Sequence, residues 1–178
     1  MNFKRVDSSK QKEISDLFSA VFSSSEGIQE GELIGNLASK LSSNIDNEDI
    51  ICFCAFDNKS IIGSIFFTRL HFTQPIRVYM LSPVAVSTKH QGKGIGQDLI
   101  NFGLSSLKEH SVSIVITYGD PSYYSKVGFE KLSESVIQPP LKLSMPIGWL
   151  GQSLSNEPIP IIEEQPGCVK EFNDPVYW

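Results

Sequence analysis

The sequence predicts an α/β (α+β) fold in which helices flank a central mixed, mostly antiparallel sheet. Three strand-like runs between residues 50 and 86 are joined by short turns. Such strands cannot be parallel, because parallel neighbours need a longer crossover. A helical segment then leads from residue 95 to a β-branched run at residues 112–118, so that strand can lie parallel to the preceding one. Two amphipathic segments precede the strands and supply further helices.

The N-terminal segment begins with a weakly alternating run at residues 3–6, which predicts an edge strand, and Ser8 and Ser9 follow as a helix cap. Two helices are predicted next, at residues 10–22 and 30–41, with a stop in the serine-rich stretch between them. The apolar residues at helical spacing are Ile14, Leu17, Phe18 and Val21 in the first helix and Leu33, Ile34, Leu37 and Leu41 in the second.

The middle of the chain contains three predicted strands, at residues 50–56, 61–73 and 76–86. A four-residue polar turn separates the first two, and Gln74-Pro75 separates the second from the third. These connections predict an antiparallel meander.

A glycine-rich loop follows the third strand and opens a helix; its residues are Gln91, Gly92, Lys93, Gly94, Ile95 and Gly96. Glycines let the backbone approach a ligand closely, because no Cβ atom blocks it and positive φ angles cost little. The N–H groups of the first helical turn have no partner inside the helix, so with the helix dipole they favour an anion. The loop therefore predicts a diphosphate site. Its spacing matches neither the P-loop nor the G-x-G-x-x-G of dinucleotide-binding folds.

The helix that this loop opens is predicted to end near His110. Its predicted buried residues are Leu99, Phe102, Gly103, Leu104 and Leu107. After the next strand, Asp120 and Pro121 start a short helix, with aspartate as the cap and proline at the first helical position. Gly128 closes that helix, and Phe129 begins another strand.

Proline becomes frequent toward the C-terminus, where seven of the ten prolines follow residue 138. Residues 141–145 and 149–154 predict further strands, and residues 156–178 predict an irregular but apolar arm that packs on the domain or on a second subunit. We therefore expect one domain, with a core at residues 1–137 and with Pro-rich strands and the arm, residues 138–178, completing it.

The composition excludes several classes of protein. The net charge of −5 argues against a general nucleic-acid binder. No apolar segment has the length of a signal peptide or a membrane span, so we expect a cytoplasmic protein without a membrane partner. Three cysteines do not form a disulfide framework, and no His and Cys cluster provides a metal site. Cys52 and Cys54 face the same side of a strand and are expected in the core.

Two motifs together resemble the signatures of the GNAT N-acetyltransferase superfamily. The first is Q/R-x-x-G-x-G/A after a strand that ends Val-Ala-Val, matched here by residues 91–96 after residues 84–86. The second covers residues 123–129, and residues 119–124 form the Gly-Asp-Pro-x-Tyr-Tyr motif of a bacterial-type subgroup. The resemblance is good over residues 50–132.

The resemblance implies the GNAT fold, with a sheet of about six to seven strands that is splayed at the acetyl-CoA site. It implies acetyl-CoA as cosubstrate and no metal. The residues implied to bind acetyl-CoA are Val84, Ala85, Val86, Gln91, Gly92, Lys93, Gly94, Ile95 and Gly96. A primary amine would attack the thioester directly in a ternary complex, with an N–H near Val84 polarising the carbonyl and Tyr124 protonating the departing thiolate. Tyr123 is expected only to pack.

The general base is not identified by the sequence. Many GNAT enzymes place a glutamate on the strand before the loop, but residues 80–83 carry no carboxylate. Thr117 and Asp120 are the nearest polar substitutes for the asparagine that usually precedes the tyrosine. Candidates for the end of a water relay are Glu26, Glu32 and His71. Candidates for contacting a cationic substrate are Glu26, Glu30 and Glu32.

Three functions remain open from the sequence. The first is an N-acetyltransferase acting on a small-molecule or protein amine, with a homodimer compatible with the apolar arm. The second is a non-catalytic acyl-CoA-binding sensor module. The absence of an identified general base favours this function, whereas the presence of Tyr124 argues against it. The third is a nucleotide-dependent oxidoreductase, which the glycine spacing and the antiparallel meander oppose.

Overall fold

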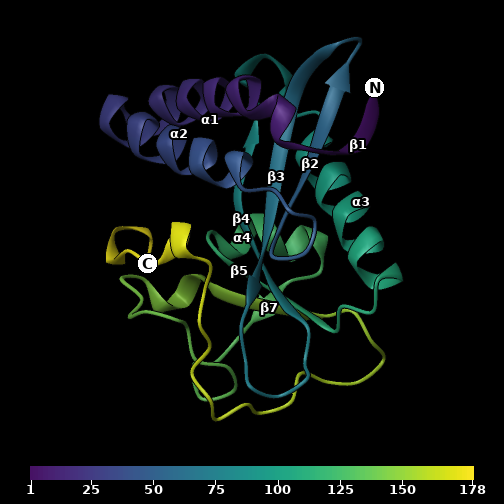
Figure 1. Cartoon of the computed structure of the whole chain (residues 1–178), viewed down its shortest axis with the longest axis vertical. Helices are drawn as coiled ribbons and strands as arrows, with labels where there is room; N and C mark the ends of the chain where they lie inside the picture. The colour runs from purple at the N-terminus through teal and green to yellow at the C-terminus, as the bar shows by residue number, and fades with distance from the viewer. The chain divides into compact units, whose positions relative to one another are not determined.

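The computed structural model describes residues 1–178 and contains seven strands and four α-helices (Figure 1). The strands are β1 (Asn2–Val6), β2 (Ile50–Asp57), β3 (Ser60–Leu70), β4 (Val78–Val86), β5 (Ile114–Tyr118), β6 (Glu130–Lys131) and β7 (Trp149–Ser153). They hydrogen-bond in the order β1-β2-β3-β4-β5-β7-β6. The β4–β5 pair is parallel, whereas the β1–β2, β5–β7 and β6–β7 pairs are antiparallel. The predicted mixed, mostly antiparallel sheet is therefore confirmed.

The helices are α1 (Gln11–Glu26), α2 (Ile28–Ser43), α3 (Ile95–Glu109) and α4 (Pro121–Tyr124). None of them combines the length and the apolarity that a membrane crossing requires. The chain divides into two compact units: unit 1 comprises Met1–Phe67 and Pro83–Gly103, and unit 2 comprises Thr68–Ser82 and Leu104–Trp178.

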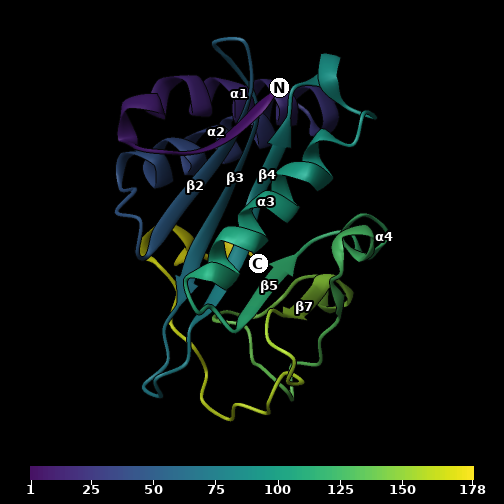
Figure 2. The ribbon, with the colours of Figure 1, turned by 90° about the vertical axis from the view of Figure 1, so that its right-hand side faces the viewer.

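In unit 1, helices cover both faces of the strands, as Figure 2 shows. Successive side chains of a strand point to opposite faces of the sheet, as do those of Phe66 and Phe67 on β3. Phe66 packs against Phe18 of α1, with ring centroids 5.8 Å apart. Phe67 packs against Phe53 of β2 on the other face, and Phe53 in turn contacts Phe102 of α3 at 5.6 Å. Phe102, predicted as buried, is 39% exposed because it lies at the outer edge of this aromatic cluster.

Helices α1 and α2 lie side by side in unit 1 (Figure 1) and meet through small residues. A Cβ atom on Gly35 would lie 2.8 Å from Ser19 Cβ, and a Cβ atom on Gly31 would overlap the side chain of Ser23. The helix predicted to end at residue 22 therefore continues for four residues, to Glu26, and Ser23 in this continuation packs against α2. The helix ends instead at Gly27, whose φ of 100° suits only glycine.

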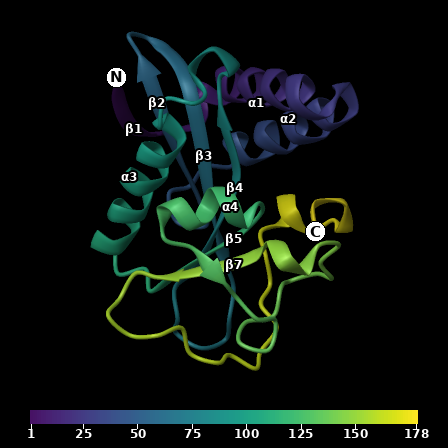
Figure 3. The ribbon, with the colours of Figure 1, turned by 180° about the vertical axis from the view of Figure 1, so that it is seen from behind.

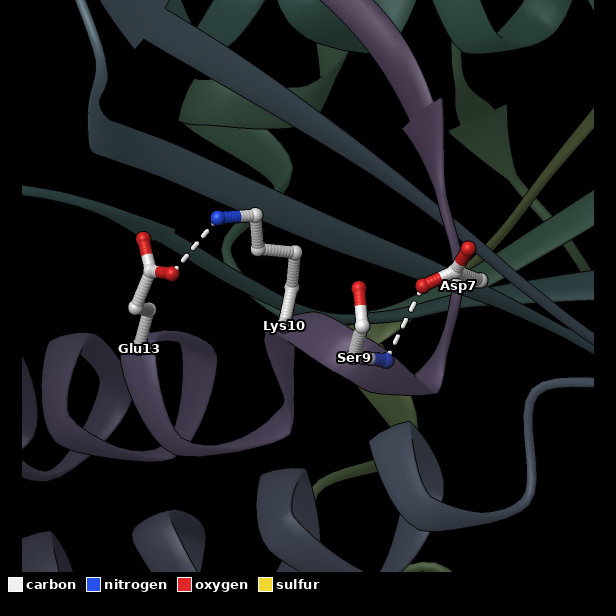
Figure 4. Close-up of polar contacts among 4 residues, drawn as sticks. All are labelled: Asp7, Ser9, Lys10 and Glu13. Carbon is white, nitrogen blue, oxygen red and sulfur yellow. Dashed lines mark hydrogen bonds and ion pairs between the residues drawn. The ribbon is translucent and has the colours of Figure 1, made fainter.

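The entry into α1 also differs from the prediction, since Asp7 rather than a serine provides the cap (Figure 4). Its carboxylate accepts a hydrogen bond from the Ser9 N–H at 2.9 Å and so starts a short 3-10 turn. The hydrogen bonds with Ser9 lower the pKa of Asp7. Lys10, at the end of this turn, donates to Glu13 at 2.6 Å in the first turn of α1.

Unit 2 contains the C-terminal arm, which is held by backbone pairing. His71 and Gly167 form an antiparallel bridge, so β3 ends at Leu70, shorter than predicted. Thr73 N–H donates to the Glu164 carboxylate at 2.9 Å. Trp178 is buried, with its indole N–H donating to the Phe172 carbonyl at 2.8 Å.

The strand predicted at residues 141–145 does not form. The Met145 N–H donates to the Tyr118 hydroxyl at 2.7 Å instead of to a neighbouring strand. A 3-10 turn, Pro146–Gly148, then leads directly into β7. The predicted strand at 149–154 corresponds to β7.

Candidate active site

The glycine-rich loop lies in unit 1, between β4 and α3. Gly92 and Gly94 have φ angles of 74° and 79°, which side-chain-bearing residues rarely adopt. A Cβ atom built on either glycine would meet no atom within 4 Å. The backbone angles thus require glycine, while the space above the loop is open to a ligand.

The first turn of α3 faces this loop with unpaired donors. The Asp98 N–H is bonded to the Gly94 carbonyl at 3.0 Å and closes the first turn. Ile95, Gly96 and Gln97 precede Asp98 in the chain. Their N–H groups have no acceptor inside the helix, because the residue four positions earlier lies outside it. Together with the positive end of the helix dipole, they form a site suited to a phosphate.

Gln91 has a structural role in the loop that sequence reasoning missed. Its side-chain amide donates to the Val86 carbonyl at 2.9 Å, which ties the loop back to the end of β4. Gln91 and Lys93 are both exposed, and Lys93 Nζ donates to the Lys89 carbonyl at 3.2 Å. The two lysines add positive charge beside the helix N-terminus.

Strands β4 and β5 pair over only part of their length. The parallel register runs from Val78↔Ile114 to Leu81↔Thr117, and the buried Thr117 hydroxyl donates to the Leu81 carbonyl at 2.8 Å. β4 then continues to Val86. In this last part of β4, Val84 and Val86 are half-buried and Ala85 is buried.

Tyr124 lies in unit 2, at the end of the short helix α4. Its ring packs edge-on against Phe129, at 5.8 Å between centroids, and against Tyr123, at 5.1 Å. It also lies on the backbone of Gly119, where an added Cβ atom would be 2.7 Å from Tyr124 Cε2. Tyr124 and Tyr123 are both half-buried.

The predicted capping residues position Tyr124. The Asp120 carboxylate accepts hydrogen bonds from both the backbone N–H and the hydroxyl of Ser122, each at 2.8 Å. Pro121 occupies the first helical turn, and Gly128 ends the segment in the left-handed region with φ of 91°. Gln152, which the sequence did not single out, donates to the Val127 carbonyl at 3.1 Å and supports this turn from β7.

The environment of Tyr124 keeps its phenol protonated. Burial raises the pKa of Tyr124 to about 12, a hydrogen bond with Thr117 acts in the opposite direction, and the charges of Tyr123 and Asp120 raise it further. Burial also raises the pKa of Tyr123. At neutral pH Tyr124 is therefore a hydrogen-bond donor and not a base.

The polar substitutes for the missing asparagine and the candidate ends of a water relay are divided between the two units. Unit 2 brings Thr117 and Asp120 to Tyr124, but the Asp120 carboxylate is already bonded to Ser122. His71, also in unit 2, is exposed and its backbone pairs with Gly167. The acids of unit 1 lie at the junction of α1 and α2; Glu26 and Glu32 are exposed and Glu30 is half-buried.

Two further features of the structure bear on the prediction of sites. No group of three or more His, Cys, Asp or Glu side chains is placed to hold a metal ion. A surface hollow of about 510 Å³ in unit 2 is lined by residues 134–142 of the β6–β7 connection and 162–165 of the arm. It includes none of the predicted site residues.

Comparison with known proteins identifies the fold. Residues 48–131 match the family described as "Acetyltransferase (GNAT) domain". The whole chain is similar to the crystal structure of the GNAT family N-acetyltransferase YhbS from Escherichia coli in complex with CoA. The TM-score is 0.79 with 21% identity, over 97% of this chain and 92% of that chain. This chain has the GNAT fold. A GNAT family acetyltransferase from Brucella melitensis, in complex with acetyl-CoA, gives a TM-score of 0.64 at 20% identity, over 94% of this chain and 93% of that chain.

The sequence is also similar to curated proteins that are named N-acetyltransferases. The uncharacterized N-acetyltransferase YhbS of Escherichia coli K12 is 35% identical over 75 residues, which is 42% of this chain and only 45% of the length of YhbS. The uncharacterized N-acetyltransferase YjhQ of the same strain is 27% identical over 164 residues, covering 88% of this chain and 86% of YjhQ.

Proposed function

We propose that this protein is an acetyl-CoA-dependent N-acetyltransferase that moves the acetyl group to a primary amine by direct attack in a ternary complex. The observation that carries the proposal is the loop at residues 91–96. Its two glycines with positive φ angles leave open space at the N-terminus of α3. The backbone N–H groups there would bind the diphosphate of CoA.

The last residues of β4 would bind the pantetheine arm. The pairing of β4 with β5 ends at Leu81↔Thr117, so Val84, Ala85 and Val86 can offer backbone groups to an extended ligand. Such pairing resembles the addition of a peptide strand to a sheet edge. The N–H of Val84 is our candidate for polarising the thioester carbonyl, because Pro83 has no N–H to donate.

In the reaction, the neutral amine forms a C–N bond with the thioester carbon and gives a tetrahedral intermediate whose nitrogen is positively charged. The C–S bond then breaks, the nitrogen loses its extra proton, and the products are the amide and the thiolate of CoA. Tyr124 would donate a hydrogen bond to the sulfur. A thiol has a pKa of about 8.5, well below the value of about 12 for Tyr124, so complete proton transfer from the phenol to the thiolate is uphill. Tyr124 would therefore act mainly by stabilising the developing negative charge, and the proton lost from the nitrogen can neutralise the thiolate.

Calorimetric titration with acetyl-CoA tests the binding part of this proposal. We expect Gly94→Glu to abolish binding, because it places a carboxylate at the proposed phosphate site. Gly27→Glu is a matched control, since Gly27 also has a positive φ and no atom within 4 Å of a Cβ position. It should lower stability but leave acetyl-CoA binding unchanged. Equal loss of binding in both variants would refute the assignment of the loop.

Thiol release from acetyl-CoA with a panel of primary amines tests the transfer. One observation favours a second function, the acyl-CoA-binding sensor: hydrogen bonds from Ser122 lower the pKa of Asp120, so this carboxylate near Tyr124 is a weaker base than an ordinary aspartate. Tight acetyl-CoA binding without thiol release for any amine class would support the sensor over the enzyme.

A further inference from the structure

We propose that Met145 and Ile147, called the apolar rim, bind an aliphatic or aromatic group next to the amine of the acceptor. The inference rests on the proposed function and adds the chemical class of its substrate. Both side chains are unusually open for large apolar residues, with 64% and 63% of their surface exposed. They lie within three residues of each other in unit 2, on either side of Pro146.

The rim is held in place by hydrogen bonds rather than left on a loose loop. The Met145 N–H donates to the Tyr118 hydroxyl at 2.7 Å, and the Ser144 and Tyr118 hydroxyls are 3.1 Å apart. On the other side of the rim, the Gly119 N–H donates to the Gly148 carbonyl at 3.0 Å. The exposure of the two side chains is therefore a property of an anchored turn.

The same contacts join the rim to the candidate acid. A Cβ atom on Gly148 would lie 2.9 Å from the Gly119 carbonyl oxygen, so the two backbones are in close contact. The Tyr124 ring lies on Gly119 in turn. Only the backbone of residue 119 therefore separates the rim turn from Tyr124.

The C-terminal residues support this turn from the side. Trp178 stacks on Tyr118, with centroids 6.4 Å apart and planes 17° from parallel, and it also contacts Trp149 directly after the turn. Figure 3 shows the end of the arm next to the turn that precedes β7. An apolar surface on an anchored backbone favours substrates with a complementary apolar group, because binding removes apolar area of both partners from water.

The test is the ratio of kcat/KM for phenethylamine to kcat/KM for ethylamine, measured by thiol release. We expect the wild-type ratio to exceed one and the double variant Met145→Ser, Ile147→Ser to lower it about tenfold, mainly through KM for phenethylamine. The fold should survive, because the side chains of Met145 and Ile147 make none of the hydrogen bonds that join the turn to Tyr118 and Gly119. Ile161→Ser is the matched control: Ile161 is also in unit 2 and 71% exposed, but lies in the arm outside the turn, so the ratio should not change.

An unchanged ratio in the double variant would overturn the proposal. A change in oligomeric state with an unchanged ratio would also overturn it and assign the rim to a contact with a second copy. If no amine releases thiol, the proposed function fails, and calorimetric binding of phenethylamine to the CoA-bound protein then tests the rim separately. Binding that the double variant weakens would support the rim, and absence of binding to the wild type would refute it.

Discussion

The ring of Tyr124 lies directly on the backbone of Gly119, with no room for a side chain between them: a Cβ atom on Gly119 would be 2.7 Å from Tyr124 Cε2. The substitution Gly119→Ala must therefore displace the ring. A shift of about 1 Å in a reacting group can reduce a rate about a hundredfold, and we expect kcat to fall by roughly tenfold to a hundredfold. Gly167→Ala is the control, because its Cβ would make only an ordinary contact, at 3.8 Å from His71 Cβ. Equal kcat values for the two variants would argue against a role for the position of Tyr124.

The pKa of Tyr124 predicts the form of the pH–rate profile. Because burial raises this pKa to about 12, the phenol stays protonated through the usual assay range. We expect kcat/KM to rise with pH as the acceptor amine loses its proton, without a descending limb up to about pH 10. Tyr124→Phe should lower kcat by about a hundredfold and keep the same rising limb. A wild-type descending limb near pH 9 that is absent from the phenylalanine variant would mean that Tyr124 titrates much lower than its environment indicates.

The hydrogen bonds of Asp46 should make the free energy of unfolding of unit 1 depend on pH in the acidic range. Partial burial tends to raise the pKa of Asp46, but hydrogen bonds from the backbone N–H groups of Ile50, Glu48 and Asp49 outweigh it and lower the pKa. These bonds are 2.8 to 2.9 Å long and all reach Oδ1. A lowered pKa in the folded state stabilises the protein above the ordinary aspartate value, and this contribution is lost as the pH falls through the lowered value.

We expect Asp46→Ala to lower the free energy of unfolding by about 1 kcal/mol at pH 7, measured by urea denaturation. The difference from wild type should shrink as the pH falls below the ordinary aspartate value of 3.8 and through the lowered pKa of Asp46. Asp46→Asn keeps an acceptor oxygen without the charge, so it should retain more stability and show a weaker pH dependence. A constant difference across this pH range would disagree with the electrostatic explanation.

Substitution of Trp178 measures how much the packing of the arm contributes to the stability of unit 2. It is 4% exposed, and its ring contacts Tyr118, Trp149 and Phe172. Trp178→Ala should lower the free energy of unfolding by about 3 kcal/mol, the lower end for large-to-small changes of a buried tryptophan. Val176, which is 55% exposed, is the comparison: Val176→Ala should change stability by less than about 0.5 kcal/mol. A similar small effect for both variants would show that the arm is not firmly packed.

The sequence predicted the elements whose signals are local. Asp120 and Gly128 were assigned as the start and end of a short helical segment, and both do this in the structure, because a cap and a left-handed residue act within a few positions. The parallel direction of β5 relative to β4 also agrees with the prediction from the helical crossover that joins them.

What the sequence could not predict depends on contacts between distant segments. The sequence predicted that the first helix stops before Ser23, whereas Ser23 lies inside α1 and packs against Gly31 of α2. The role of Gly119 likewise requires the position of the Tyr124 ring, although both residues belong to a motif visible in the sequence. The anchoring of Met145 by Tyr118 joins residues 27 positions apart, and no local pattern indicates it.

The bond between Thr73 and Glu164 has a consequence for how the chain folds, since 91 positions separate the two residues. His71 and Gly167 add a second pairing of similar span. Long loops must close before such pairings are rewarded, and folding that depends on them is slow. The segment Thr68–Ser82 is also synthesised well before the partners in Leu104–Trp178 that complete unit 2. Until those partners have been synthesised, the apolar residues of Thr68–Ser82 stay exposed to solvent. We expect the nascent chain to be prone to aggregation, and to need chaperones, during this interval.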